Sequence, residues 1–264
     1  MFLNLLWRPP SSPEIPPDTI YLGFVLLSDV PSFAEVCASM KEEECRATHV
    51  ERTDKGLIAR IDDSLVTVTF HNEPFPDGEA EAHVDAGRYP DGLPGEHRAH
   101  ARIVARTDPK TTIHRSCLRE CQFHRAIAWM EMTYCLSALP EAIGVYNPQS
   151  EETISAAEFH WLVDEDQDSL APALISMSVE HSLLGTNIRT RGFRSLGHVE
   201  LEILHSQRTD EDIRRVISMI AHSVFTGGVI PHSQMPSKIG GYDIFAHYTR
   251  SLRSWWQWVT RIEV

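Results

Sequence analysis

The stretch "HRSCLRECQFHRAIAWMEMTYCLSA", residues 114–138, lies in the middle of a 264-residue chain, between two sets of strand-like segments. Its first eleven residues hold two histidines and two cysteines, the residue types that bind zinc. On a helix, His114, Cys117, Cys121 and His124 share one face. However, ten residues of helix span about 15 Å, whereas zinc holds its ligands at about 2.0–2.3 Å. One ion cannot contact all four side chains of a straight helix.

The rest of the stretch favours a core helix. Apolar residues continue the same face: Leu118, Ala128, Met132, Cys135, Leu136 and Leu139. Free cysteine packs as a small hydrophobe, so core packing accounts for every position on this face. A second apolar side consists of Phe123, Ile127, Met130 and Tyr134. We therefore expect a helix sandwiched between two layers, and no metal site.

On the amino-terminal side of this helix, "TIYLGFVLLS" (19–28) has the short apolar pattern of a buried strand. Ser32 and Glu35 then have the spacing of a capping box, which predicts the start of a helix. "GLIARI" (56–61) and "SLVTVTF" (64–70) indicate a hairpin. Residues 72–95 are rich in proline, glycine and acids and predict an irregular excursion, after which "HRAHARIVAR" (97–106) returns to the sheet.

On the carboxyl-terminal side, "ALISMSVE" (173–180) and "VELEIL" (199–204) indicate strands, and "YDIFAHYT" (242–249) indicates a closing strand. Between them, Thr209 and Asp212 open a helix. Its predicted apolar stripe is Ile213, Val216, Ile217, Ile220 and Val224.

These elements predict an α+β fold: two strand–helix–strand half-domains, with mixed or antiparallel sheets, packed around a central helical segment. The expected organisation is a proline-rich lead-in (1–18), an amino-terminal half (19–110), a central helical segment (111–170) and a carboxyl-terminal half with a tryptophan-rich tail (171–264). We expect one compact unit.

The composition, 42% hydrophobic and 23% charged, is typical of a soluble globular protein. A net charge of −13 disfavours nucleic acid and anionic membranes and favours a basic protein partner. Five cysteines without the spacing of a disulfide framework fit a reducing compartment. No stretch approaches the roughly 18 apolar residues of a membrane span. These features predict a cytoplasmic protein.

One segment offers catalytic chemistry. On a strand, "HVELEIL" places His198, Glu200 and Glu202 on one face, where they could bind a metal or share acid–base work. The same alternation is typical of a half-exposed strand, and we favour a solvated face. No nucleotide loop or nucleophile motif is present, so the sequence favours a protein without catalysis or cofactor.

Two segments are candidate partner-binding surfaces. An acidic loop of Asp164, Glu165, Asp166 and Asp168 follows a helix that Ser155 and Glu158 are expected to open. Near the carboxyl end, Trp255, Trp256 and Trp258 form a dense aromatic cluster of the kind used in binding hot spots. The sequence alone does not decide which of these two surfaces binds the partner.

"TRGFRSLGHVELEIL" (190–204) and "VFTGGVIPHSQMPSKIG" (224–240) resemble the bacterial family of domain of unknown function 4261. Upstream, "FVLLSDVPSF", "HNEPFPDGEAE" and "HRAHARIVA" are similar to the leading portion of that family, so the resemblance covers most of residues 20–248. The chain departs from the pattern at "PHSQMPSKIG", and its tryptophan-rich tail is extra. The family implies no reaction and no catalytic residues.

The hypothesis that these features favour is an immunity-type inhibitor that binds and neutralises a bacterial toxin. The alternatives are a metal-assisted hydrolase using His198, Glu200 and Glu202, and a structural or regulatory component of a larger assembly.

Overall fold

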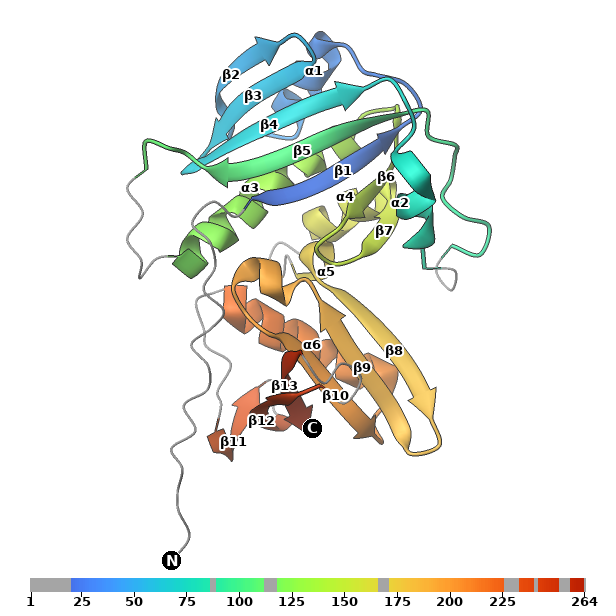
Figure 1. The fold of residues 1–264 in the computed structure, drawn as a ribbon, viewed down its shortest axis with the longest axis vertical. Coiled ribbons are helices and arrows are strands. Elements are labelled where there is room, and N and C mark those ends of the chain that lie inside the picture. The colour runs from blue at the N-terminus through green and yellow to red at the C-terminus, as the bar shows by residue number, and fades with distance from the viewer. Residues whose placement is uncertain are drawn as a thin grey trace, which may run out of the picture.

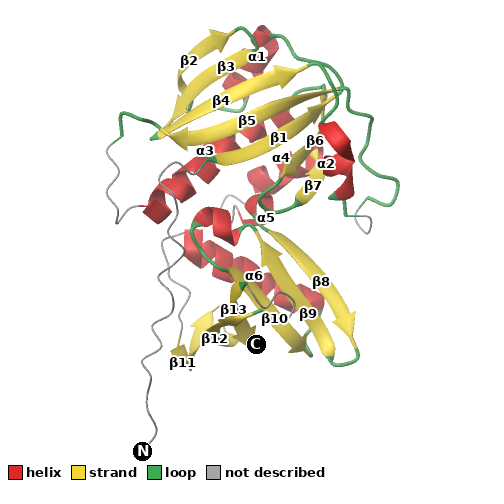
Figure 2. Cartoon of the chain, viewed as in Figure 1, coloured by secondary structure: helices red, strands yellow, loops and turns green. Residues whose placement is uncertain are grey.

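The computed structural model describes residues 20–85, 89–111, 118–165, 171–225, 233–239, 242–251 and 257–263. The chain has the predicted α+β fold, built on two sheets (Figure 1). Helices α3 (Leu118–Ser137) and α6 (Asp210–Phe225) both lie behind the strands in the view of Figure 2. No helix among the described residues is long and apolar enough to cross a bilayer.

The first sheet, sheet A, has seven strands in the order β2-β3-β4-β5-β1-β6-β7, and every neighbouring pair is antiparallel. Its strands are β1 (Tyr21–Leu27), β2 (Thr48–Thr53), β3 (Gly56–Ile61), β4 (Ser64–His71), β5 (Ala99–Thr107), β6 (Ala142–Asn147) and β7 (Glu152–Ser155). The predicted segment 111–170 thus contributes two strands as well as helices. The run "AIGVYN" is short and apolar, which suits a strand better than a helix.

Strand β1 lies in the interior of sheet A and is buried on both faces. Val25 and Leu27 belong to the main core on the α3 side, while Phe24 and Leu26 belong to a second cluster on the opposite face. This double burial explains why the strand reads as a continuous apolar run rather than an alternating one.

Helix α3 packs across β1, β4, β5 and β6, and it is the predicted core helix. The expected core residues Ala128, Met132, Cys135, Leu136 and Leu139 are all buried. On the other side Met130 is buried and Ile127 and Tyr134 pack against the same core, as a sandwiched helix requires. His114 and Cys117 lie outside the described residues, and Cys121 is only partly buried.

Two further helices join α3 on this face of sheet A: α1 (Phe33–Glu42) and α4 (Ala156–Glu165). The predicted capping box is present, because the Glu35 N–H donates to the Ser32 hydroxyl and the Ser32 N–H donates to the Glu35 carboxylate. The Ser155 hydroxyl accepts from the Glu158 N–H at 3.1 Å, so α4 also begins where the sequence predicts.

The excursion after β4 folds back over the opposite face of sheet A. It contains η1 (Pro76–Gly78) and α2 (Glu79–Ala82), and it brings Phe75 and Ala80 against Phe24 and Tyr146. His97 fixes this segment, since its Nε2 accepts from the Phe75 N–H at 3.0 Å. The predicted irregular region therefore forms a small core of its own.

The second sheet, sheet B, has six strands in the order β11-β12-β13-β10-β9-β8. Its strands are β8 (Ser176–Ser182), β9 (Gly185–Arg191), β10 (Glu200–Ser206), β11 (Ser233–Ile239), β12 (Tyr242–Arg250) and β13 (Trp258–Glu263), with the short helices α5 (Ala171–Leu174) and η3 (Phe193–Leu196). The pair β10 and β13 is parallel and the others are antiparallel. Strand β12, expected to close the sheet, is therefore followed by one more strand.

All five residues of the predicted stripe on α6 are buried in the core of this half. That core is continuous with the core under sheet A, since both belong to one cluster of buried side chains. Near the junction, the Tyr21 hydroxyl is hydrogen bonded to the side chains of Asn147 and Ser195. Complete burial raises the pKa of Tyr21 to about 12, so this hydroxyl stays protonated.

Candidate functional site

The strand that offered catalytic chemistry is buried on both faces, so the expected solvated face is wrong. Glu200 is 6% exposed and Glu202 is 3% exposed. The reason is that other groups pack over the glutamate face of β10: Thr190 and the turn at Gly192 lie against Glu200, and Ser251 and Arg261 lie against Glu202. A buried carboxylate needs internal hydrogen bonds or a counter-ion, and each glutamate has its own set.

Glu200 binds the turn that precedes its strand. Its carboxylate accepts from the Thr190 hydroxyl at 2.9 Å and from the backbone N–H groups of Gly192 and Arg194 at 3.1 and 3.2 Å. Gly192 has φ of 115°, a left-handed conformation that favours glycine. Burial raises the pKa of Glu200 above its usual range, and these hydrogen bonds oppose the rise.

Glu202 connects β10 to Ser251 and to the neighbouring strand β13. Its carboxylate accepts from the Ser251 hydroxyl at 2.8 Å and forms an ion pair with Arg261 of β13 at 2.9 Å. His198 precedes the strand and is not part of it. Among the described residues, no group of three or more His, Cys, Asp or Glu side chains is placed to hold a metal ion. The geometry gives these two glutamates a structural role.

The predicted acidic loop is described only in part. Asp164 is exposed in the last turn of α4, and Glu165 is the last residue of that helix. Asp166 and Asp168 lie outside the described residues, as do Trp255 and Trp256. Trp258 is the first residue of β13.

Beside Asp164, the structure reveals a feature that the sequence analysis did not select. Trp161 is 56% exposed, a large value for so large an apolar side chain. Ala157, Trp161 and Asp164 are spaced four and three residues apart and form the exposed stripe of α4, here called the α4 face. Phe159 points the other way and is buried in the core. Helical spacing alone could have separated these two stripes.

A network of polar contacts supports the α4 face. His160 stacks on Tyr134 of α3 with ring centroids 4.1 Å apart, and its Nε2 lies 3.2 Å from the Glu43 carboxylate at the end of α1. Burial, the hydrogen bond to Glu43 and the charges of Glu43 and Asp164 raise the pKa of Tyr134 above its usual range. Three helices thus hold this surface in place.

The negative charge of the chain is concentrated in the half that carries the α4 face. Residues 19–170 contain 27 acidic and 13 basic residues, whereas residues 171–264 contain 8 acidic and 10 basic residues. The resulting net charges are −14 and +2. The negative electrostatic field of the chain therefore comes from its amino-terminal half.

No family model, no curated protein and no solved structure matches this chain. The resemblance to domain of unknown function 4261 stays a prediction from the quoted motifs. The functional argument accordingly rests on the geometry and charge of the chain itself.

Proposed function

We propose that this protein is a non-catalytic inhibitor of the immunity type, which binds and neutralises a basic toxin or effector domain in the bacterial cytoplasm. The observation that carries the proposal is the α4 face, where an exposed tryptophan adjoins an acidic helix end in the strongly acidic half of the chain. Inhibition of this kind requires surface complementarity and no chemistry.

Trp161 has the properties of a binding hot spot. Tryptophan is enriched among residues whose truncation costs about 2 kcal/mol or more of binding energy, because a large rigid ring buries much area on contact. The network of Glu43, Tyr134 and His160 holds the neighbouring groups in place, which lowers the entropy lost when a partner binds.

The acidic residues beside Trp161 favour a basic partner. Asp164 and Glu165 occupy the last turn of α4, where no basic residue is present. The carboxyl end of a helix carries partial negative charge, so acidic side chains there are unfavourable by about 0.3–1 kcal/mol each. Cationic groups of a partner would relieve this repulsion on binding.

The test is a growth-rescue assay followed by a binding measurement. The chain is co-expressed with each toxic product encoded beside its own gene, and the affinity for any toxin it neutralises is measured by calorimetry. We expect Trp161→Ala to weaken binding at least about tenfold, or 1.4 kcal/mol. Its melting temperature should stay close to that of the wild type, because the side chain is exposed in the free protein.

Leu184→Ala and Glu51→Gln are the matched controls, since Leu184 is 65% exposed at the tip of the β8–β9 hairpin and Glu51 is an exposed acid on β2. Both should bind as the wild type does. Failure to rescue growth from any of the toxins would contradict the proposed function. If the protein rescues growth and the Trp161→Ala variant binds the toxin with full affinity, the proposed function stands but the α4 face is excluded as the binding surface.

A further inference from the structure

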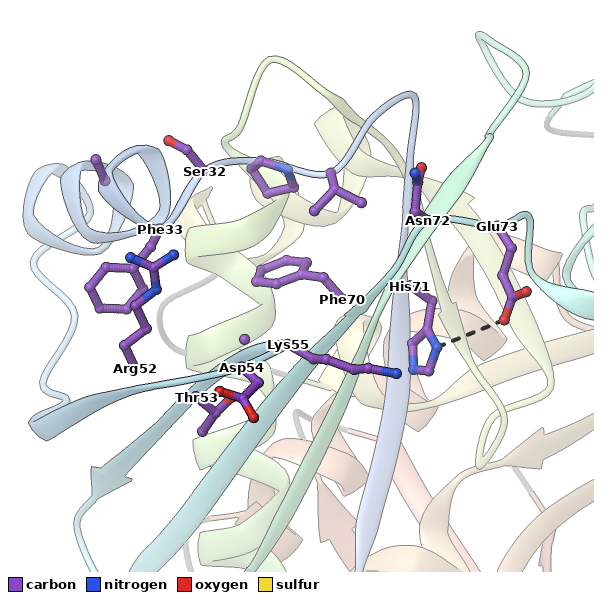
Figure 3. A pocket seen from close by; sticks show the side chains of 14 residues that line it. Ser32, Phe33, Arg52, Thr53, Asp54, Lys55, Phe70, His71, Asn72 and Glu73 are labelled. Atoms are coloured by element: carbon purple, nitrogen blue, oxygen red, sulfur yellow. Dashed lines mark ion pairs between the residues drawn. The ribbon is translucent and has the colours of Figure 1, made fainter.

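A separate hollow of about 840 Å³ lies at the other end of α1, far along that helix from Glu43. The start of α1, the turn between β2 and β3 and the end of β4 line it (Figure 3). Pockets that bind small molecules typically measure about 300–1,000 Å³. The hollow is large enough for a ligand of that class.

The floor of this pocket is aromatic. Val66, Val68 and Phe70 share the inner face of β4, and the first two are buried in the core. Phe70 is the last of the row and is only partly buried, so its ring reaches the pocket (Figure 3). Phe33, at the first position of α1, supplies a second ring, and the Arg52 guanidinium lies 5.6 Å from its centroid.

Two cations border the floor without ion-pair partners among the described residues. They are Arg52 and Lys55, on either side of the β2–β3 turn, and Figure 3 shows Lys55 extending along the pocket toward His71. By contrast, Arg46 and Arg60 of the same region are paired with Asp62 and Asp108.

The acidic residues of the lining do not neutralise these cations directly. Glu73 lies 3.9 Å from the His71 ring, and Asp54 is exposed in the turn itself. The amino-terminal end of α1 also faces this region, but the Glu35 carboxylate of the capping box offsets the partial positive charge of that helix start. The aromatic floor and the cationic rim together suit a ligand that has a flat ring and a negatively charged group.

We propose that this pocket binds a small anionic ligand with a flat ring. The ring lies against Phe70, the phosphate or carboxylate of the ligand meets Lys55, and Arg52 adds positive charge from the opposite rim, beside Phe33. The site is independent of the α4 face, and neither proposal requires the other.

The test is an NMR titration of the full chain with four probes. A nucleoside monophosphate combines a ring with a phosphate, and indole-3-carboxylate combines a ring with a carboxylate. Inorganic phosphate and the uncharged nucleoside each lack one of the two groups. We expect at least one ring-bearing anion to shift the amide signals around Phe70, Lys55 and Gly56 at millimolar concentration or below. The ring-bearing anion that binds more tightly would show whether the site prefers a phosphate or a carboxylate.

Variants then assign the contacts. Lys55→Ala should weaken binding at least about tenfold and Arg52→Gln by a smaller factor. Lys41→Ala, at an exposed lysine at the far end of α1, removes the same charge as Lys55→Ala and should change nothing. Phe70→Leu should weaken only the ring-bearing probes, provided that its melting curve shows a folded protein. The proposal is excluded if neither ring-bearing anion shifts these signals. It is equally excluded if Lys41→Ala weakens binding as much as Lys55→Ala, or if inorganic phosphate binds as well as the ring-bearing anions.

Discussion

Trp129 of α3 packs against β1 at a position where the strand has no side chain. A Cβ at residue 23 would lie 2.3 Å from a ring carbon of Trp129, closer than real contacts allow. Because Trp129 is fully buried, its ring has little room to move away. We predict that Gly23→Ala lowers the free energy of unfolding by about 1–3 kcal/mol, the usual cost of overpacking a core. Urea denaturation of the variant and the wild type measures this difference in unfolding free energy.

Gly95→Ala is the control for this substitution, because a Cβ there would meet Ile143 at an ordinary contact distance of 3.4 Å. It should change the unfolding free energy by less than about 0.5 kcal/mol. Equal stability of the Gly23→Ala variant and the wild type would show that α3 can shift away from sheet A.

His100 predicts how stability depends on pH. Its ring stacks on His71 with centroids 4.6 Å apart and meets the edge of Phe75, and burial lowers its pKa below 6.5. The unfolded chain therefore takes up the proton at a higher pH than the folded chain does. Above pH 6.5 the buried neutral His100 costs the folded protein no stability. As the pH falls from 6.5 toward the lower pKa that His100 has in the folded state, stability is lost.

We expect His100→Phe to make the unfolding free energy less dependent on pH below 6.5, because the variant cannot take up this proton. His205→Asn is the control: His205 is exposed, and asparagine tolerates its φ of 53°. Chemical denaturation at a series of pH values provides the comparison. Identical pH profiles for His100→Phe and the wild type would assign the acid sensitivity to other groups.

At the scale of elements, the helices and strands that the sequence predicted are those whose apolar pattern reflects burial within their own half of the chain. Strand β1, α1 with its capping box, and the apolar stripe of α6 belong to this class. Strand β2 was missed because its residues are mostly exposed, so it has no apolar face to detect. Strand β9 was missed because Thr186 and Thr190 flank Ile188 on its buried face, and threonine does not register as apolar.

The candidate site was harder to predict than the fold. Glu200 and Glu202 show the alternation of an exposed strand, and only the turn that packs over Glu200 and the groups that pack over Glu202 reveal that they are buried. The partners of Glu202, Ser251 and Arg261, lie about fifty to sixty residues away from it in sequence. Helical spacing separates the Trp161 stripe of α4 from the Phe159 stripe, but which of the two faces solvent depends on how α4 docks on α3.

The ion pair between Glu202 and Arg261 gives a prediction for β10 and β13. Glu202→Ala leaves Arg261, whose side chain is 18% exposed, with much of its charge buried and this partner removed. Breaking a buried pair in this way costs about 3–5 kcal/mol. Glu211→Ala removes a glutamate paired with Arg215 on the surface of α6 and should cost at most about 1 kcal/mol. Similar denaturation midpoints for the two variants would mean that the pair in sheet B contributes little.

At the scale of the whole molecule, the separation of charge predicts how a partner approaches. Exposed charges are screened beyond about 8–10 Å at 0.1–0.15 M ionic strength. We expect the association rate with a basic toxin to fall as salt rises, while the dissociation rate changes little. Stopped-flow measurements over a range of salt concentrations provide the check. An association rate independent of salt would mean that the net charge of −13 serves solubility alone.

The position of β13 in sheet B has a consequence for how the protein is made. Although it comes last among the described strands, β13 lies between β12 and β10. Until residues 258–263 have left the ribosome, β10 and β12 each present an unpaired edge, and sheet B exists only as two separate pieces. Open strand edges promote pairing with other chains. Biosynthesis therefore passes through a stage prone to aggregation, and a stop codon before residue 258 would make that stage permanent.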